Sequence, residues 1–118
     1  MKIFKGLFVA ILVFSVQAQA ADYDRAGIEY CVLAGPSSLL SIENESQLTD
    51  EVVRLMTEAV NVADSDRWIN SSRPAFVWAS EAKVACGKAY GYLRASVRDE
   101  EYLNKCECFH QRMVQFMY

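Results

Sequence analysis

The chain has 118 residues, of which 53% are hydrophobic and 23% charged, and its net charge at pH 7 is −3. A chain of this length forms one small domain. The excess of acidic over basic residues argues against nucleic acid or an anionic membrane as partner, because both favour a basic surface. If the domain binds a partner, a basic protein is the expected one.

The first 20 residues have the pattern of a secretory signal peptide. Lys2 and Lys5 give a basic start, residues 7–16 form an apolar run, and Ala18-Gln19-Ala20 supplies small residues for cleavage. The run is about half of the roughly 20 residues that a membrane-spanning helix needs. We therefore expect cleavage after Ala20, with residues 21–118 forming a single helical domain in the periplasm or outside the cell. That domain has 10 basic and 15 acidic residues, a net charge of −5.

The exported part begins with a pattern typical of a helix. Asp22 is a good N-cap, and Gly35-Pro36 stops the helix after about Ala34. Its apolar residues recur at intervals of three and four, at Tyr23, Ala26, Gly27, Tyr30, Cys31 and Ala34. Residues 37–46 are rich in Ser and Asn and predict a loop with one short helical turn.

A second helix is expected from Thr49, as N-cap, to about Ala63. Acidic residues at positions 50 and 51 suit the positive end of the helix dipole. Its expected buried stripe is Val52, Val53, Met56, Ala59, Val60 and Ala63. A polar segment, residues 64–73, follows, and there we expect Trp68 and Ile69 to tether the chain to the core.

Two further helices fill the rest of the chain. Pro74 suits the first turn of a helix that extends to about Arg94, with a face of mainly small side chains at Trp78, Ala82, Ala85, Cys86, Ala89 and Leu93. Residues 95–98 make a turn, and Asp99 caps a last helix that extends to the end of the chain. Its inward residues are Tyr102, Leu103, Cys106, Phe109, Met113, Phe116 and Met117.

No long alternation of polar and apolar residues and no hairpin signal is present. The sequence therefore predicts an all-α fold, a small disulfide-stapled bundle of about four helices.

Four cysteines in an exported chain predict two disulfides. If the last two helices form a hairpin that turns near residue 96, Cys86 faces Cys106. Cys108 lies two residues further on, about 200° round the helix, and points elsewhere. The remaining partner for Cys108 is then Cys31. Of the three possible connectivities we therefore favour Cys86–Cys106 with Cys31–Cys108.

Several chemical sites can be weighed and set aside. Cys106-Glu107-Cys108-Phe109-His110 lacks the spacing of a haem-attachment motif. Metal binding by these side chains is not expected when the cysteines form disulfides. The segment that begins at Asp64 lacks the glycine and the final glutamate of a calcium loop. We predict no catalytic residues, no metal and no cofactor.

The sequence favours a non-enzymatic binding module that occludes a partner protein. The layout, a small exported helical domain held by disulfides, is similar to that of helical periplasmic immunity proteins that neutralise cell-wall amidases delivered by type VI secretion. Acidic and aromatic residues at helix ends and in the loop are the candidate partner-binding residues: Asp64, Asp66, Trp68, Asp99, Glu100 and Glu101. Among the aromatic residues, Trp68 and Tyr92 are the two expected to be partly exposed.

Two other functions stay open. One is a periplasmic chaperone or stress protein, which would need a titratable switch or an exposed apolar patch. The other is a small exported hydrolase that uses His110, the only histidine, although no nucleophile or orienting group can be assigned beside it.

Overall fold

The computed structural model describes Cys31, Leu33 and residues 37–118. The predicted signal peptide and nearly all of the first predicted helix, 22–34, lie outside the described residues. The regular elements of the described part are η1 (Ser38–Ser41), α2 (Glu45–Ala63), α3 (Asp66–Ile69), α4 (Ala75–Arg94) and α5 (Glu100–Met117). All are helical, so the all-α prediction is confirmed there. None of these helices is long and apolar enough to cross a membrane.

The start of α2 differs from the prediction. The helix begins at Glu45, and its N-cap is Asn44, whose side chain accepts a hydrogen bond of 3.0 Å from the backbone N–H of Gln47. Thr49, the predicted cap, lies inside the first turns. Both residue types are good N-caps, but the earlier one brings Leu48 into the helix, where it is fully buried. The predicted short helical turn before α2 is present as η1.

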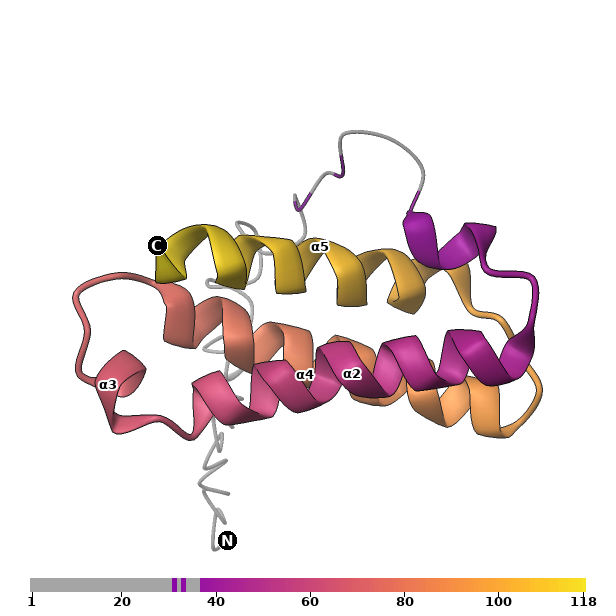
Figure 1. Cartoon of the computed structure of the whole chain (residues 1–118), viewed down its shortest axis with the longest axis horizontal. Helices are drawn as coiled ribbons and strands as arrows, with labels where there is room; N and C mark the ends of the chain where they lie inside the picture. The colour runs from indigo at the N-terminus through magenta and orange to yellow at the C-terminus, as the bar shows by residue number, and fades with distance from the viewer. Residues whose placement is uncertain (1–30, 32, 34–36) are drawn as a thin grey trace, which may run out of the picture.

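The last two helices agree closely with the prediction. Pro74 directly precedes α4, at its N-cap position. The side chain of Asp99 caps α5 by accepting a hydrogen bond of 2.9 Å from the backbone N–H of Tyr102. The two helices form an antiparallel hairpin (Figure 1).

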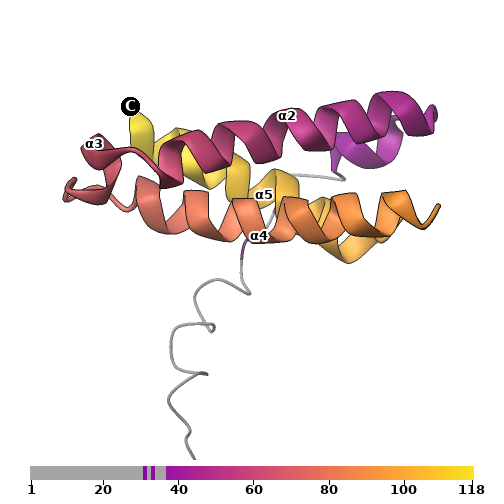
Figure 2. The same ribbon diagram turned by 90° about the horizontal axis from the view of Figure 1, so that it is seen from below.

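Helix α4 is the central element, because it packs against both α2 and α5, whereas those two touch each other less (Figure 2). Its buried face is made almost entirely of alanine. Small side chains let the neighbouring helices approach closely, and the larger residues come from α2 and α5. Buried on this face are Ala75, Ala79, Ala82, Ala85, Cys86 and Ala89.

The turn between α4 and α5 is tight and has an unusual residue at its centre. Ser96 has φ 59°, a left-handed conformation that normally selects glycine. The N–H of Val97 donates to the carbonyl of Tyr92 (2.9 Å), and the N–H of Ser96 donates to that of Leu93 (3.0 Å). These two bonds are the Schellman pattern that ends many helices.

Both disulfides join the predicted pairs. Cys86 on α4 is bonded to Cys106 on α5, and Cys31 is bonded to Cys108, also on α5. Cys106 and Cys108 point to different sides of α5, as their spacing requires. Both cross-links therefore fix the position of α5.

The segment between α2 and α4 corrects one prediction. Trp68 lies in the short helix α3 and is only 8% exposed, with the guanidinium of Arg67 4.6 Å from its ring centre. It is a tether to the core, as expected, and not a partly exposed aromatic. Ile69, the other expected tether, is 46% exposed. In a helix of one turn, adjacent residues face different sides, so only one of the two can reach the core.

Candidate functional site

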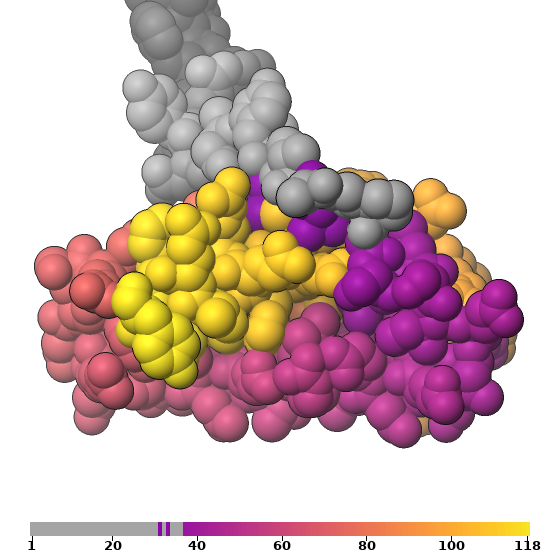
Figure 3. Space-filling model, turned by 45° about the horizontal axis from the view of Figure 1, so that its top comes forward, coloured from indigo at the N-terminus to yellow at the C-terminus, as the bar shows by residue number. Residues whose placement is uncertain are grey.

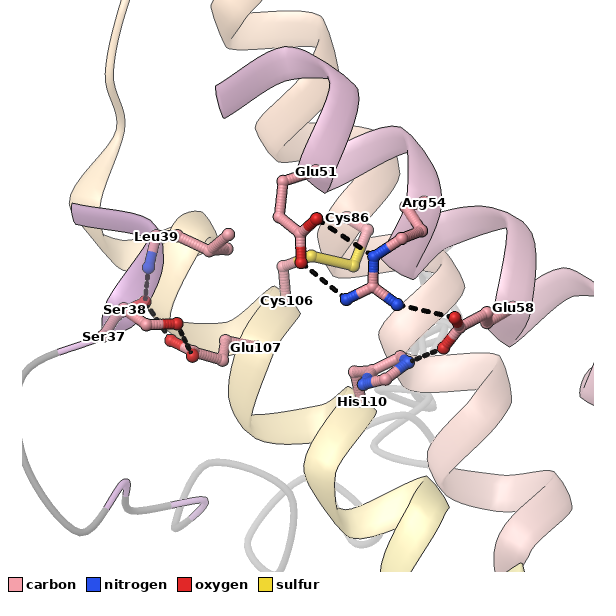
Figure 4. Close-up of polar contacts among 10 residues, drawn as sticks. All are labelled: Ser37, Ser38, Leu39, Glu51, Arg54, Glu58, Cys86, Cys106, Glu107 and His110. Atoms are coloured by element: carbon pink, nitrogen blue, oxygen red, sulfur yellow. Dashed lines mark hydrogen bonds and ion pairs between the residues drawn. A yellow bond between two sulfur atoms is a disulfide. The ribbon is translucent and has the colours of Figure 1, made fainter. Parts of the chain in front are cut away.

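A row of charged side chains runs across α2 and ends on α5 (Figure 4). The guanidinium of Arg54 donates to both carboxylate oxygens of Glu51, at 3.0 Å and 2.5 Å, and to Glu58 at 2.6 Å. The second oxygen of Glu58 lies 2.5 Å from Nε2 of His110. His110 is buried, so this row connects the exposed side of α2 to the interior of α5.

The electrostatics of the row follow from Arg54. Its hydrogen bonds to Glu51 hold the pKa of that carboxyl below its usual value, because they favour the charged form. The same contact raises the pKa of Arg54, with smaller contributions from Glu58. The charge of Arg54 is thus paired with carboxylates of its own helix, at spacings of three residues (Glu51) and four residues (Glu58).

His110 is paired with a carboxylate from another helix. Its ring contacts Glu58, and in the described part of the chain no hydroxyl hydrogen-bonds to it. The hydroxyls of Ser37 and Ser38 instead donate to the buried carboxylate of Glu107 (Figure 4). The His110–Glu58 contact thus joins α5 to α2, and the two serines join the segment before α2 to α5.

No metal-binding cluster of three or more His, Cys, Asp or Glu side chains occurs in the described residues. The two cysteines of α5, Cys106 and Cys108, both belong to disulfides. The described residues therefore offer no ligand set for a metal.

The predicted partner-binding residues lie at two opposite ends of the bundle. Asp64 and Asp66 are at the end that carries α3, whereas Asp99, Glu100 and Glu101 are at the α4–α5 turn (Figure 1). Helix α4 joins the two ends and is about 30 Å long. The six residues cannot form one compact site, and Trp68 is buried at the α3 end.

The end with α3 has a balanced charge. Asp64 and Asp66 are exposed, but so are Arg67 and Arg73 on the same segment. Two cations close to two carboxylates leave little net field for steering a charged partner.

The opposite end, which we call the turn end, gathers acidic residues from two segments. Arg98, in the turn, donates hydrogen bonds to the backbone carbonyls of Ile42 and Glu43, the latter at 3.3 Å. These bonds hold the residues before α2 beside the start of α5. The turn-end carboxylates are Glu43, Glu45, Asp99, Glu100 and Glu101. Figure 3 shows η1 and the first turns of α2, in purple, at the same end of the molecule as the orange turn.

The roles of these carboxylates differ. Asp99 caps α5, and Glu101 forms an ion pair of 2.7 Å with Lys105. Among the described residues, Glu43, Glu45 and Glu100 have no ion-pair partner, and all three are exposed. Val97, in the turn itself, is 45% exposed. The turn end therefore presents free carboxylates and, in the turn itself, an exposed apolar residue.

Glu43 and Glu45 were missed by sequence analysis. The acidic cluster at 99–101 is visible in the sequence, but the residues that join it come from 55 positions away, through the contact of Arg98 with Glu43. A lone arginine in a turn carries no signal for such a contact.

The side of the molecule next to the turn end has a shallow depression of about 580 Å³. Two tyrosine rings, Tyr92 and Tyr102, stack there with their centres 5.8 Å apart. The ammonium of Lys88 lies 5.0 Å from the ring centre of Tyr102. Tyr92 is 41% exposed, as expected.

Comparison of the sequence with protein-family models and with curated proteins, and of the fold with solved structures, finds no match.

Proposed function

We propose that this chain is an exported, non-enzymatic binding module and that the turn end is its partner-facing surface. The observation that carries the proposal is the pair of hydrogen bonds from Arg98 to the carbonyls of Ile42 and Glu43. They bring acidic groups of two distant segments onto one rigid end. The partner is a protein with a basic surface, and the binding occludes that surface. An inhibitor or immunity-type role fits this mode of action and the similar layout noted from the sequence.

Rigidity supports a binding role. Two disulfides end on α5, and the turn before α5 is closed by the Schellman hydrogen bonds. A surface that is already ordered loses little conformational entropy when it binds. Loops held by such a scaffold are common places for contacts with partners.

Charge decides between the two ends. The turn end has five carboxylates and three cations, the cations being Arg94, Arg98 and Lys105. At the α3 end two carboxylates face two cations. A net acidic field raises the association rate with a basic partner and makes that rate sensitive to salt. The turn end is therefore the better candidate, with exposed Val97 of the same end as the apolar contact.

The test begins with a pull-down from the periplasmic extract of the source organism, followed by identification of the retained protein. Association rates of that purified protein are then measured with two charge-reversed variants. One is Glu43→Lys/Glu45→Lys at the turn end. The matched control, Asp64→Lys/Asp66→Lys, makes the same change of charge at the α3 end. We expect the turn-end variant to associate roughly 10-fold more slowly at low salt, with a weaker dependence on salt.

The control variant should bind with nearly unchanged kinetics. The opposite result, slow association only for the Asp64/Asp66 variant, would move the site to the α3 end. Unchanged rates for both variants would remove both acidic ends from the partner-facing surface. Val97→Asp tests the apolar contact separately, because it should mainly raise the dissociation rate.

A further inference from the structure

The outer face of α4, on the side away from the core, carries exposed apolar residues at regular spacing. Val77 is 48% exposed and Val84 is 51% exposed, and Gly91, also exposed, follows after another seven residues. Seven residues make nearly two helical turns, so the three positions form one straight line on the helix. They lie opposite the buried alanines. Apolar residues on both faces are typical of a helix that is covered on both.

Gly91 leaves an open notch in this line. A Cβ atom built at Gly91 would have no heavy atom within 4 Å apart from its chain neighbours and the backbone of its own helix. The notch is continuous with the depression described above, which is lined by Lys88, Gly91, Tyr92, Ala95 and Tyr102. A glycine in the middle of a helix is less favourable than an alanine, because it loses more conformational freedom on folding. No contact within the described chain explains its presence, whereas an incoming side chain would use the space.

Charged residues on one flank of the line have opposite signs. Glu81 lies three residues before Val84, and Lys88 lies four residues after it. At 100° per residue both are on the same side of the line. In the described residues, the ammonium of Lys88 contacts the hydroxyl of Tyr102 at 3.4 Å and no carboxylate. Glu81 has no ion pair in the same part of the chain.

We propose that α4 pairs with α4 of a second copy of this chain, antiparallel, about a two-fold axis at Val84. In this register Val84 meets Val84 of the second copy. Val77 enters the notch at Gly91 of the second copy, because both positions lie seven residues from Val84. A two-fold axis of this kind brings equal flanks of the two helices together, so Glu81 pairs with Lys88 of the second copy, and the reverse pair follows by symmetry.

The pattern fits a second copy better than an unrelated helix. An interface with two-fold symmetry must be complementary to itself. This face meets that condition in three ways. The apolar Val84 lies at the axis, Val77 lies across from the notch at Gly91, and Glu81 lies across from the oppositely charged Lys88. The pairing buries one helix face, which is less than the roughly 800 Å² per partner of a standard interface, so the dimer is expected to dissociate on dilution.

The experiment is sedimentation velocity of the oxidised protein across a dilution series of about three decades in concentration, since weak interfaces dissociate in that range. We expect the mass to rise from that of one chain to that of two. Val84→Glu puts two like charges at the axis and should keep the protein monomeric throughout. Val114→Glu is the matched control, because Val114 is 38% exposed on α5 and away from this face. It should dimerise like the parent.

A charge exchange tests the register. Glu81→Lys and Lys88→Glu should each weaken the dimer, and the double variant should restore it, because the opposite charges again face each other. Gly91→Leu places a side chain in the notch, where an added Cβ meets open space, and should also prevent pairing. Circular dichroism of every variant reports that the monomer is folded.

A monomer at all concentrations would overturn the proposal. A dimer that survives both Val84→Glu and Gly91→Leu would place the interface elsewhere and overturn it too. Neither result affects the proposed binding at the turn end, because the residues reversed in charge there, Glu43 and Glu45, lie outside the outer face of α4. Loss of dimerisation and loss of partner binding are therefore distinguishable.

Discussion

Ser96 shows how a single residue can carry backbone strain in this fold. Its φ of 59° places a residue with a Cβ in the left-handed region, at a cost of roughly 1–2 kcal/mol. The two Schellman hydrogen bonds fix it there. We predict that Ser96→Gly raises the free energy of unfolding by about 0.5–1 kcal/mol, part of the gain being offset by the greater entropy of glycine in the unfolded chain.

Urea unfolding measures this change, with Ser96→Val as the contrasting variant. A β-branched residue tolerates the left-handed region poorly and should lower stability. Equal stability of the glycine and valine variants would contradict a strained turn.

Glu51 and Arg54 allow a second prediction at the residue scale. Arg54 lowers the pKa of Glu51 by favouring its charged form. The contact therefore stabilises the fold at pH values above 4.5, the usual pKa of a glutamate. This contribution is lost as the pH falls through the lowered pKa of Glu51. Because the side chains are 53% and 34% exposed, solvent screening limits it to a few tenths of a kcal/mol.

We predict that Arg54→Gln raises the pKa of Glu51 towards its usual value, as followed by NMR titration of the side-chain carboxyl. Arg112→Gln removes an arginine from α5 instead and serves as control. A pKa of Glu51 that is the same with and without Arg54 would show that the contact does not form in solution.

At the scale of the helices, α4 has positions that differ in how much side-chain volume they can hold. Ala82 is fully buried between the neighbouring helices, whereas Gly91 faces open space. Adding atoms to a tightly packed site forces strain of typically 1–3 kcal/mol. Adding a methyl group to an exposed glycine in a helix gains roughly 0.5–1 kcal/mol.

We therefore predict that Ala82→Leu lowers the midpoint of thermal unfolding and that Gly91→Ala raises it, although both add volume to the same helix. The comparison is made by calorimetry at low protein concentration, where pairing of two chains does not contribute. If Ala82→Leu were tolerated as well as Gly91→Ala, the close approach at the alanine face would be wrong.

The helices also show which parts of the fold local sequence signals can define. α4 and α5 were predicted almost to the residue, because Pro74 and Asp99 act within one turn of their own position. The start of α2 was not, because Asn44 and Thr49 are both good caps and only the burial of Leu48 decides between them. Burial depends on the tertiary structure, which the local pattern does not contain.

For the whole molecule, the disulfides give the clearest prediction. The protein should have no free thiol, since the structure pairs all four cysteines. Mass measurement after alkylation without reductant should find no added alkyl group. Proteolysis under the same conditions should release a peptide with Cys86 linked to Cys106. A link between Cys31 and Cys86 would instead contradict the hairpin register.

The candidate site is harder to predict from local sequence than the fold is, because it depends on contacts between distant segments. Three of the turn-end carboxylates were among the predicted residues, and they stand together in the sequence. Glu43 and Glu45 are placed beside them through Arg98, and Trp68, another of the predicted residues, is buried in the structure. Contacts between distant segments decide both outcomes, and neither has a local signature.

The two cross-links also define the covalent topology of the chain. The ring closed by Cys86 and Cys106 lies wholly within the larger ring closed by Cys31 and Cys108. The two pairs do not cross in the sequence, so the inner ring can be closed without any contribution from the outer bond. Oxidation can then begin at the hairpin, where the cysteines are only 20 residues apart, because short loops close at the lowest entropic cost. The outer bond can then be added, or reduced again, while the inner ring stays closed.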